Sequence, residues 1–107
     1  MIEGIAEKRW TVEEANAALG EVSALVSEAM RSWQMGNRAR VMAIVAQLAG
    51  RAVVLRDVET GLIDFVGVSP SGRDYFLCWM WGEPEIDTWH WPEDGFAGRT
   101  PVGLPPE

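Results

Sequence analysis

Acidic side chains and the single histidine of this chain gather in its C-terminal third. Glu83, Glu85, Glu93 and Asp94 lie close in sequence to His90. An imidazole transfers protons near neutral pH, and a neighbouring carboxylate fixes its tautomer and raises its pKa. Three alternatives stay open for His90: acid–base catalysis, metal binding, or packing with its ring nitrogens bonded to the backbone. If a metal is bound, we expect His90, Glu83 and Glu85 to hold it; no cofactor is predicted.

In the catalytic interpretation, His90 is the proton-transfer group. Asp64 and Glu83 orient it or activate water, and Arg99 binds an anionic group or a developing negative charge. Asp64 stands between Ile63 and Phe65 in an otherwise apolar run. It therefore either faces solvent or is buried with a counter-ion, for which Arg56 and Arg99 are the candidates, because an unpaired buried carboxylate is costly.

Aromatic residues surround this polar group of residues. Four tryptophans stand at positions 79, 81, 89 and 91. They either fill a core or an interface, or form the walls of a pocket for a flat apolar or cationic ligand. Cys78 lies within the same apolar run, where we interpret it as a structural thiol rather than a nucleophile. The predicted ligand-binding residues are Trp79, Trp81, Trp89, Arg56 and Phe96.

The sequence lacks the strong catalytic and phosphate-binding motifs, so composition sets the remaining bounds. The 107 residues suffice for one domain, and one cysteine excludes an intrachain disulfide. A net charge of −7 opposes binding to nucleic acid or to an anionic membrane surface, although residues 29–56 carry only basic charges. No stretch is long and apolar enough for a membrane span, and no secretory signal is visible, so a cytoplasmic protein is expected.

The elements that must position these residues follow from periodicity. Thr11 and Glu14 form a capping-box pattern, and apolar residues then recur at alternating spacings of three and four. These patterns predict helices over about 11–34 and 38–49, separated by Gly36 and Asn37. Three apolar, β-branched or aromatic runs follow, with a turn at Thr60 and Gly61 between the first two. The remaining residues are rich in proline and glycine.

The predicted fold is α+β, a single domain over 1–107. An antiparallel helical hairpin (about 11–50) packs on a three-stranded antiparallel sheet (about 52–81), and an irregular, Trp-rich segment (82–107) closes one end. The strands are apolar on both faces. We therefore expect either a homodimer or larger homo-oligomer, or a cover made by the C-terminal segment.

Four sequence blocks in order carry a family resemblance: WTVEEANAAL at 10–19, DVETGLIDF at 57–65, CWMWGEPEIDTWH at 78–90 and GFAGR at 95–99. They resemble the bacterial domain of unknown function 2203 family. The resemblance implies a helical hairpin followed by a short β region, and no settled activity. It also implies a longer, charge-rich hairpin than this sequence has. The polar positions that it marks without assigned roles are Glu14, Asn16, Asp57, Glu59, Asp64, Cys78, Glu83, Glu85, His90 and Arg99.

The leading functional hypothesis is a small-molecule enzyme of hydrolase, lyase or isomerase type that uses acid–base chemistry in a Trp-lined pocket. The alternative is a non-catalytic homo-oligomeric interaction or ligand-binding protein, in which the tryptophans form an interface. A mononuclear carboxylate–histidine metal site is the third. The first two differ in whether His90 remains reachable from solvent.

Overall fold

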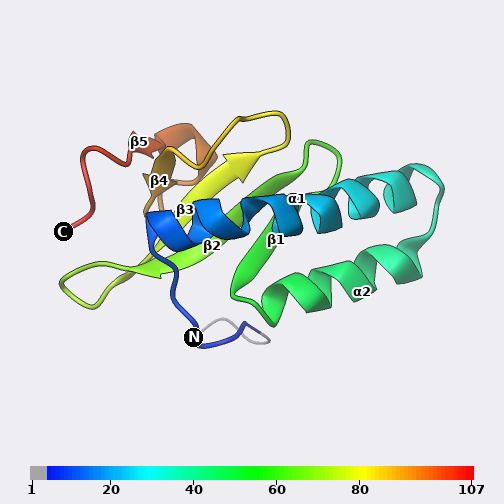
Figure 1. Ribbon diagram of the computed structural model, residues 1–107, viewed down its shortest axis with the longest axis horizontal. Helices are drawn as coiled ribbons and strands as arrows, with labels where there is room; N and C mark the ends of the chain where they lie inside the picture. Colours follow the sequence, from blue (N-terminus) through cyan, green and yellow to red (C-terminus); the bar gives the residue numbers. More distant parts are fainter. Residues whose placement is uncertain (1–4) are drawn as a thin grey trace.

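The computed structural model of the protein describes residues 5–107, so residues 1–4 of the predicted domain lie outside the described part. Helices α1 (Val12–Gln34) and α2 (Arg38–Ala49) come first and lie antiparallel (Figure 1). Across residues 5–107, neither helix combines the length and the apolar character that a bilayer crossing requires. The elements that follow are β1 (Val53–Asp57), β2 (Leu62–Val68), β3 (Asp74–Met80), β4 (Thr88–His90), the 3-10 helix η1 (Phe96–Gly98) and β5 (Thr100–Pro101).

The helical hairpin forms as the caps and the periodicity predict. The Thr11 hydroxyl accepts from the Glu14 amide at 3.1 Å, and the Glu14 carboxylate accepts from the Thr11 amide at 3.0 Å. Asn37 caps α2 by accepting from the amide of Arg40. The predicted apolar face of α1 is buried along most of its length, but Trp33 at its end is 39% exposed. The buried apolar residues of the two helices are Ala15, Val22, Val26, Ala29, Val41, Ile44 and Leu48.

The sheet has five antiparallel strands in the order β1-β2-β3-β4-β5, so the prediction of three strands was wrong. The first three strands are those expected. The two added strands come from the segment predicted to be irregular, and they are too short to show a period of two amid proline and glycine. Asn16 of α1 fixes the β3–β4 connection, because its side chain both donates to and accepts from the backbone of Ile86.

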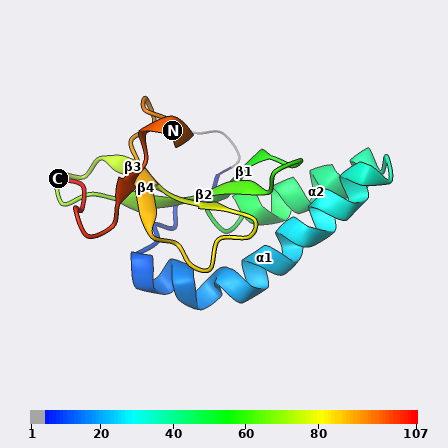
Figure 2. The ribbon, with the colours of Figure 1, turned by 90° about the horizontal axis from the view of Figure 1, so that it is seen from above.

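The two faces of the sheet have different neighbours. The cross-strand pairs Ile63↔Trp79 and Phe65↔Leu77 belong to the face that packs into the core with the helices. Since side chains alternate along a strand, Asp64↔Cys78 belongs to the opposite face. Figure 2 shows α1 on one side of the sheet and the turn that contains η1 on the other. The C-terminal segment therefore supplies the cover that the second apolar face required.

Candidate functional site

Asp64 lies in the middle of β2, and its carboxylate is buried with only 2% of the residue exposed. Of the two predicted environments, the buried one is therefore found. Its Oδ2 atom accepts from Arg56 Nε at 2.9 Å, and its Oδ1 atom lies 3.1 Å from His90 Nε2. Arg56 is the extra residue of an irregularity in β1, where Leu55 and Asp57 pair with consecutive residues of β2. Such a bulge redirects a side chain, and here the guanidinium reaches the carboxylate.

His90, at the end of β4, has hydrogen-bond acceptors at both ring nitrogens. Nδ1 lies 2.8 Å from the carbonyl oxygen of Trp91, and Nε2 faces the Asp64 carboxylate. A backbone carbonyl can only accept, so Nδ1 carries a proton, and an ionised carboxylate can only accept as well. A hydrogen bond between Nε2 and Asp64 Oδ1 therefore requires a second proton, shared between the imidazole and the carboxyl group.

The pKa of His90 reflects this geometry. Burial of the ring lowers the pKa, but the hydrogen bonds to Asp64 and to the Trp91 carbonyl and the negative charge of Asp64 outweigh burial. The nearby Arg56 charge opposes them only in part. The pKa of His90 is consequently raised above its usual value, and the imidazolium–carboxylate pair is favoured.

Cys78 joins this pair from β3. It stands directly opposite Asp64 in the strand register, and the Sγ, carboxylate and imidazole ligand atoms of Cys78, Asp64 and His90 all lie within 4.8 Å of one another. Burial raises the pKa of the Cys78 thiol to about 12, with a further contribution from the charge of Asp64 that Arg99 partly offsets. The thiol is therefore protonated at neutral pH, as a structural cysteine would be, but its position is beside the polar pair.

A cavity of about 330 Å³ opens over these three side chains. Its remaining wall is mostly apolar and comes largely from the C-terminal segment that covers this face. His90 is only 4% exposed, yet it forms part of the cavity wall. The lining residues are Arg56, Leu62, Asp64, Cys78, His90, Pro92, Gly95 and Phe96.

Glu83 and Arg99, both predicted to be catalytic, are brought together with each other rather than with His90. Arg99 Nη1 donates to Glu83 Oε2 at 2.9 Å, and Glu83 Oε1 accepts from the Met80 amide at 2.7 Å. The Arg99 guanidinium also lies over the ring of Phe96 at 4.0 Å. This ion pair thus fastens the segment that carries Phe96 to the end of β3.

The tryptophans do not line this cavity, so the predicted Trp-lined pocket is not the one that contains His90. Trp79 and Trp89 are buried on the helix face of the sheet, where their indole N–H groups donate to the carbonyls of Glu83 and Leu104. Trp81 is 45% exposed and packs edge-on against Trp79. The tryptophans miss the cavity because side chains alternate between the two faces of a strand. Residues 77, 79 and 81 therefore point away from the face that carries Cys78.

The alternative metal-ligand set is also changed by the fold. Glu83 is paired with Arg99, and Glu85 is exposed in the β3–β4 connection. Among the described residues, the group of side chains close enough to share an ion is Asp64, Cys78 and His90. Asp64 and Cys78 are the two members of this group that the predicted metal-ligand set left out. The sequence held one indication of this grouping. Asp64 and Cys78 lie inside two consecutive predicted strands, and they pair directly across the β2–β3 register, so their side chains point to the same face of the sheet.

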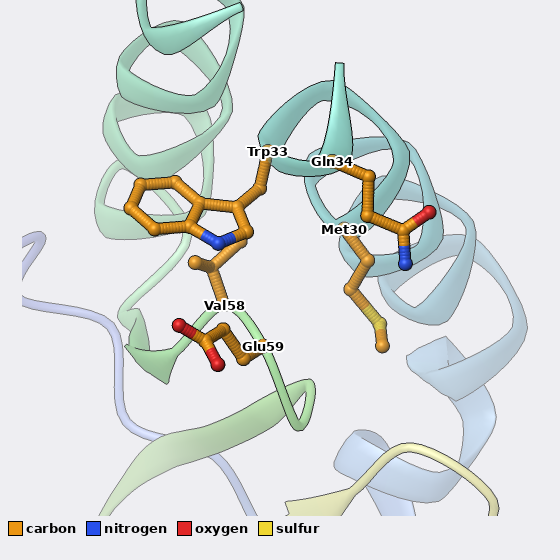
Figure 3. Close-up of a pocket in the computed structure, with 5 residues that line it drawn as sticks. All are labelled: Met30, Trp33, Gln34, Val58 and Glu59. Atoms are coloured by element: carbon orange, nitrogen blue, oxygen red, sulfur yellow. The ribbon is translucent and has the colours of Figure 1, made fainter. Parts of the chain in front are cut away.

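A second hollow, of about 480 Å³, lies between the end of α1 and the β1–β2 turn. In Figure 3, the Trp33 ring and the Gln34 side chain border it from the helix, and Val58 and Glu59 lie across from them. Met30 completes the lining, and among residues 5–107 Glu59 is the one ionisable residue that borders the hollow. The described residues around this hollow bring together one amide and one carboxylate, without a nucleophile or an acid–base pair.

The fold and the site together define a small α+β domain with a buried Asp–Cys–His group beneath a C-terminal cover. The chain belongs to the family described as uncharacterized conserved protein (DUF2203), whose family model matches residues 34–102. The family resemblance is thereby confirmed, although the WTVEEANAAL block lies outside the matched range. Neither the curated proteins nor the solved structures contain a match to the chain.

Proposed function

We propose that the cavity over Asp64, Cys78 and His90 is the active site of an enzyme that performs acid–base chemistry on a small molecule. The observation that supports this proposal is that reactive side chains from separate strands meet at one cavity. Three buried side chains capable of chemistry come from three adjacent strands and meet at one wall of a cavity whose other walls are largely apolar. Concave apolar sites with a few convergent polar groups are the usual form of small-molecule sites.

Arg56 indicates what such a substrate carries. Asp64 accepts from its Nε, the Phe76 ring lies 4.7 Å from its guanidinium carbon, and the side chain is 39% exposed at the cavity edge. A guanidinium has five N–H donors in a planar array, so donors remain for a carboxylate or phosphate group of a ligand. We therefore expect an anionic small molecule, bound by Arg56 with its reacting atoms over Asp64 and His90.

A turnover screen tests this proposal. The protein is incubated with a panel of small carboxylic and phosphoric acids, their esters and hydroxy acids, and products are detected by mass spectrometry. General acid–base groups contribute roughly 10²–10⁴-fold in rate, so His90→Gln and Asp64→Asn should each reduce any turnover at least about 100-fold. Glu85→Gln, which changes an exposed carboxylate nearby, is the matched control and should leave the rate unchanged. Turnover that survives both site substitutions would refute the proposal.

Self-association is the second candidate, and it rests on a separate surface. Trp33, Met35 and Met42 at the end of the helical hairpin are 39%, 84% and 63% exposed. Exposed apolar groups of this size on a small domain favour burial against a second copy. If the hairpin ends form a homodimer contact, Trp33→Glu should weaken the dimer. Light scattering should then give the mass of a monomer for the variant and of a dimer for the wild type. A wild-type protein that is monomeric at high concentration would contradict this candidate.

A further inference from the structure

Asp64, Cys78 and His90 each bring one potential metal-ligating atom to the same wall of the cavity. We propose that Asp64, Cys78 and His90 form a binding site for one divalent transition-metal ion, best matched to zinc, with its remaining coordination position directed into the cavity. The inference rests on the proposed function and deepens it: Asp64 and His90 would hold the ion, and the acid–base step would pass to a water molecule bound to that ion. It also revises the ligand set expected from sequence, in which Glu83 and Glu85 stood in place of Asp64 and Cys78.

The donor atoms match the ion. Thiolate sulfur, imidazole nitrogen and carboxylate oxygen are the ligands that zinc takes, and catalytic zinc sites have three protein ligands and one open position. With bonds of about 2.0–2.3 Å, tetrahedral ligand atoms stand roughly 3.3–3.8 Å apart. Asp64 Oδ1 and His90 Nε2 are already 3.1 Å apart, and the Cys78 Sγ atom completes a group that lies within 4.8 Å. The three ligand atoms thus already stand close to the separations that one tetrahedral ion requires.

The surrounding hydrogen bonds are those that orient metal ligands. A metal-bound histidine commonly donates its other ring N–H to a backbone carbonyl or a carboxylate, and a ligating carboxylate is itself hydrogen-bonded. Here His90 Nδ1 faces the Trp91 carbonyl at 2.8 Å, and Asp64 Oδ2 accepts from Arg56 at 2.9 Å. Nε2 and Oδ1 are thus the atoms left for an ion.

Thr88 provides an independent observation. Its Oγ1 atom is buried and has no hydrogen-bond partner among the described residues, and Thr88 stands directly opposite Cys78 in the β3–β4 register. Directly opposed residues place their side chains on the same face of a sheet. An unpartnered buried hydroxyl is costly. A thiolate at Cys78 would accept from it, as would a water molecule on the ion.

Binding of the ion releases protons, which keeps the charge of the site balanced. Zn²⁺ displaces the proton shared by Asp64 and His90 and the thiol proton of Cys78, so that two protons leave to the buffer and the ion takes their place. A bound zinc ion lowers the pKa of its water ligand and so supplies a nucleophile or base inside the cavity. Arg56 would then bind the anionic group of the substrate beside that water.

Cobalt(II) titration of the chelator-treated protein is the decisive experiment. The chain has one cysteine and one histidine, so a sulfur-to-cobalt charge-transfer band in the wild-type spectrum identifies Cys78 without any substitution. We expect one Co²⁺ per chain, with the band and with the d–d spectrum of a four-coordinate ion, and loss of both when Zn²⁺ is added. Cys78→Ser should remove the charge-transfer band, and His90→Gln should weaken Co²⁺ binding at least about 10-fold.

Glu85→Gln is the control, and it should bind Co²⁺ as the wild type does; circular dichroism shows whether each variant is folded. Weak Co²⁺ binding without the charge-transfer band, which is the behaviour of an adventitious ion on surface carboxylates, would overturn the inference. The two proposals can fail separately. Turnover by a protein whose Co²⁺ spectrum lacks the charge-transfer band refutes the metal site and leaves the proposed function in place. Stoichiometric Co²⁺ binding with the band, together with turnover that survives His90→Gln and Asp64→Asn, refutes the proposed function and leaves the metal site in place.

Discussion

Asp64→Asn should reverse the direction in which pH changes the stability of the metal-free protein. In the wild type, the raised pKa of His90 means that the folded state holds its imidazole proton more tightly than the unfolded state does. The stabilisation that this proton gives the folded state is complete below about 6.5, the pKa of His90 in the unfolded chain. It is lost as the pH rises through the pKa of His90 in the folded protein. Each unit by which the folded pKa exceeds the unfolded one adds about 1.4 kcal/mol to the free energy of unfolding.

An asparagine at position 64 would form hydrogen bonds that favour the neutral form of the His90 imidazole. Its amide oxygen can accept from Arg56 Nε, and its amide nitrogen can donate to the bare Nε2 of His90, whose Nδ1 proton still faces the Trp91 carbonyl. Burial then lowers the pKa of His90 with no carboxylate to oppose it. The stability of this variant should therefore be full above the unfolded pKa and should fall as the pH drops below about 6.5.

The size of the loss depends on whether a partner remains. Asp64→Ala removes the carboxylate from a buried group, and breaking buried ion pairs costs roughly 3–5 kcal/mol. We expect about 3 kcal/mol, at the lower end of that range, because Arg56 is 39% exposed and recovers hydration. Asp64→Asn keeps the hydrogen bonds and should cost about 1 kcal/mol near pH 8.

Urea unfolding followed by tryptophan fluorescence, with chelator present, measures these differences between about pH 5.5 and 8. His90 is the only histidine. Burial raises the pKa of the Cys78 thiol to about 12, so the thiol keeps its proton in the folded protein, and its titration in the unfolded state is common to wild type and variant. The difference between wild type and variant thus isolates one group. Stability curves that run parallel across the window would show that Asp64 and His90 do not share a proton.

Three further predictions concern the frame of the site. Asn16→Ala should cost about 1–3 kcal/mol in urea unfolding, because both hydrogen bonds to Ile86 are lost; a cost no larger than that of Gln47→Ala, an exposed amide on α2, would contradict this role. Cys78 should react with iodoacetamide at pH 8 far more slowly in the folded, metal-free protein than in urea, since burial raises its pKa to about 12; equal rates would disprove its burial. Gly61→Ala should destabilise by more than about 1 kcal/mol, because φ is 70° and an added Cβ would meet Trp81 Cβ at 2.7 Å; an unchanged unfolding midpoint would contradict it.

The elements with strong local signals could be predicted from the sequence. The capping box at Thr11 and Glu14, the break at Gly36 and the turn at Gly61 depend on interactions between close neighbours in the chain. Strands β4 and β5 could not, because strands of three and two residues are stabilised by pairing with partners distant in sequence rather than by their own pattern.

The candidate site was predicted in part for the same reason. Asp64, His90 and Arg56 were recognised as polar residues in apolar surroundings, and their residue types suffice for that. Which side chains share a face depends on the register of β2, β3 and β4, and the register places Cys78 with Asp64 while it turns the tryptophans to the helix side. Glu83 and Arg99 carry the right charges for catalysis, yet they satisfy each other in an ion pair.

The most direct test of the central claim is a long-range proton–nitrogen NMR spectrum of His90 during titration with small anionic ligands. The sole imidazole of the chain gives one set of signals, and it lines the cavity. We predict that at least one small carboxylate or phosphate ester shifts these signals saturably in the wild type. Filling the cavity by Phe96→Trp should abolish the shift. Imidazole signals that remain unmoved by every compound, or that respond equally in Phe96→Trp, would contradict a functional site at this position.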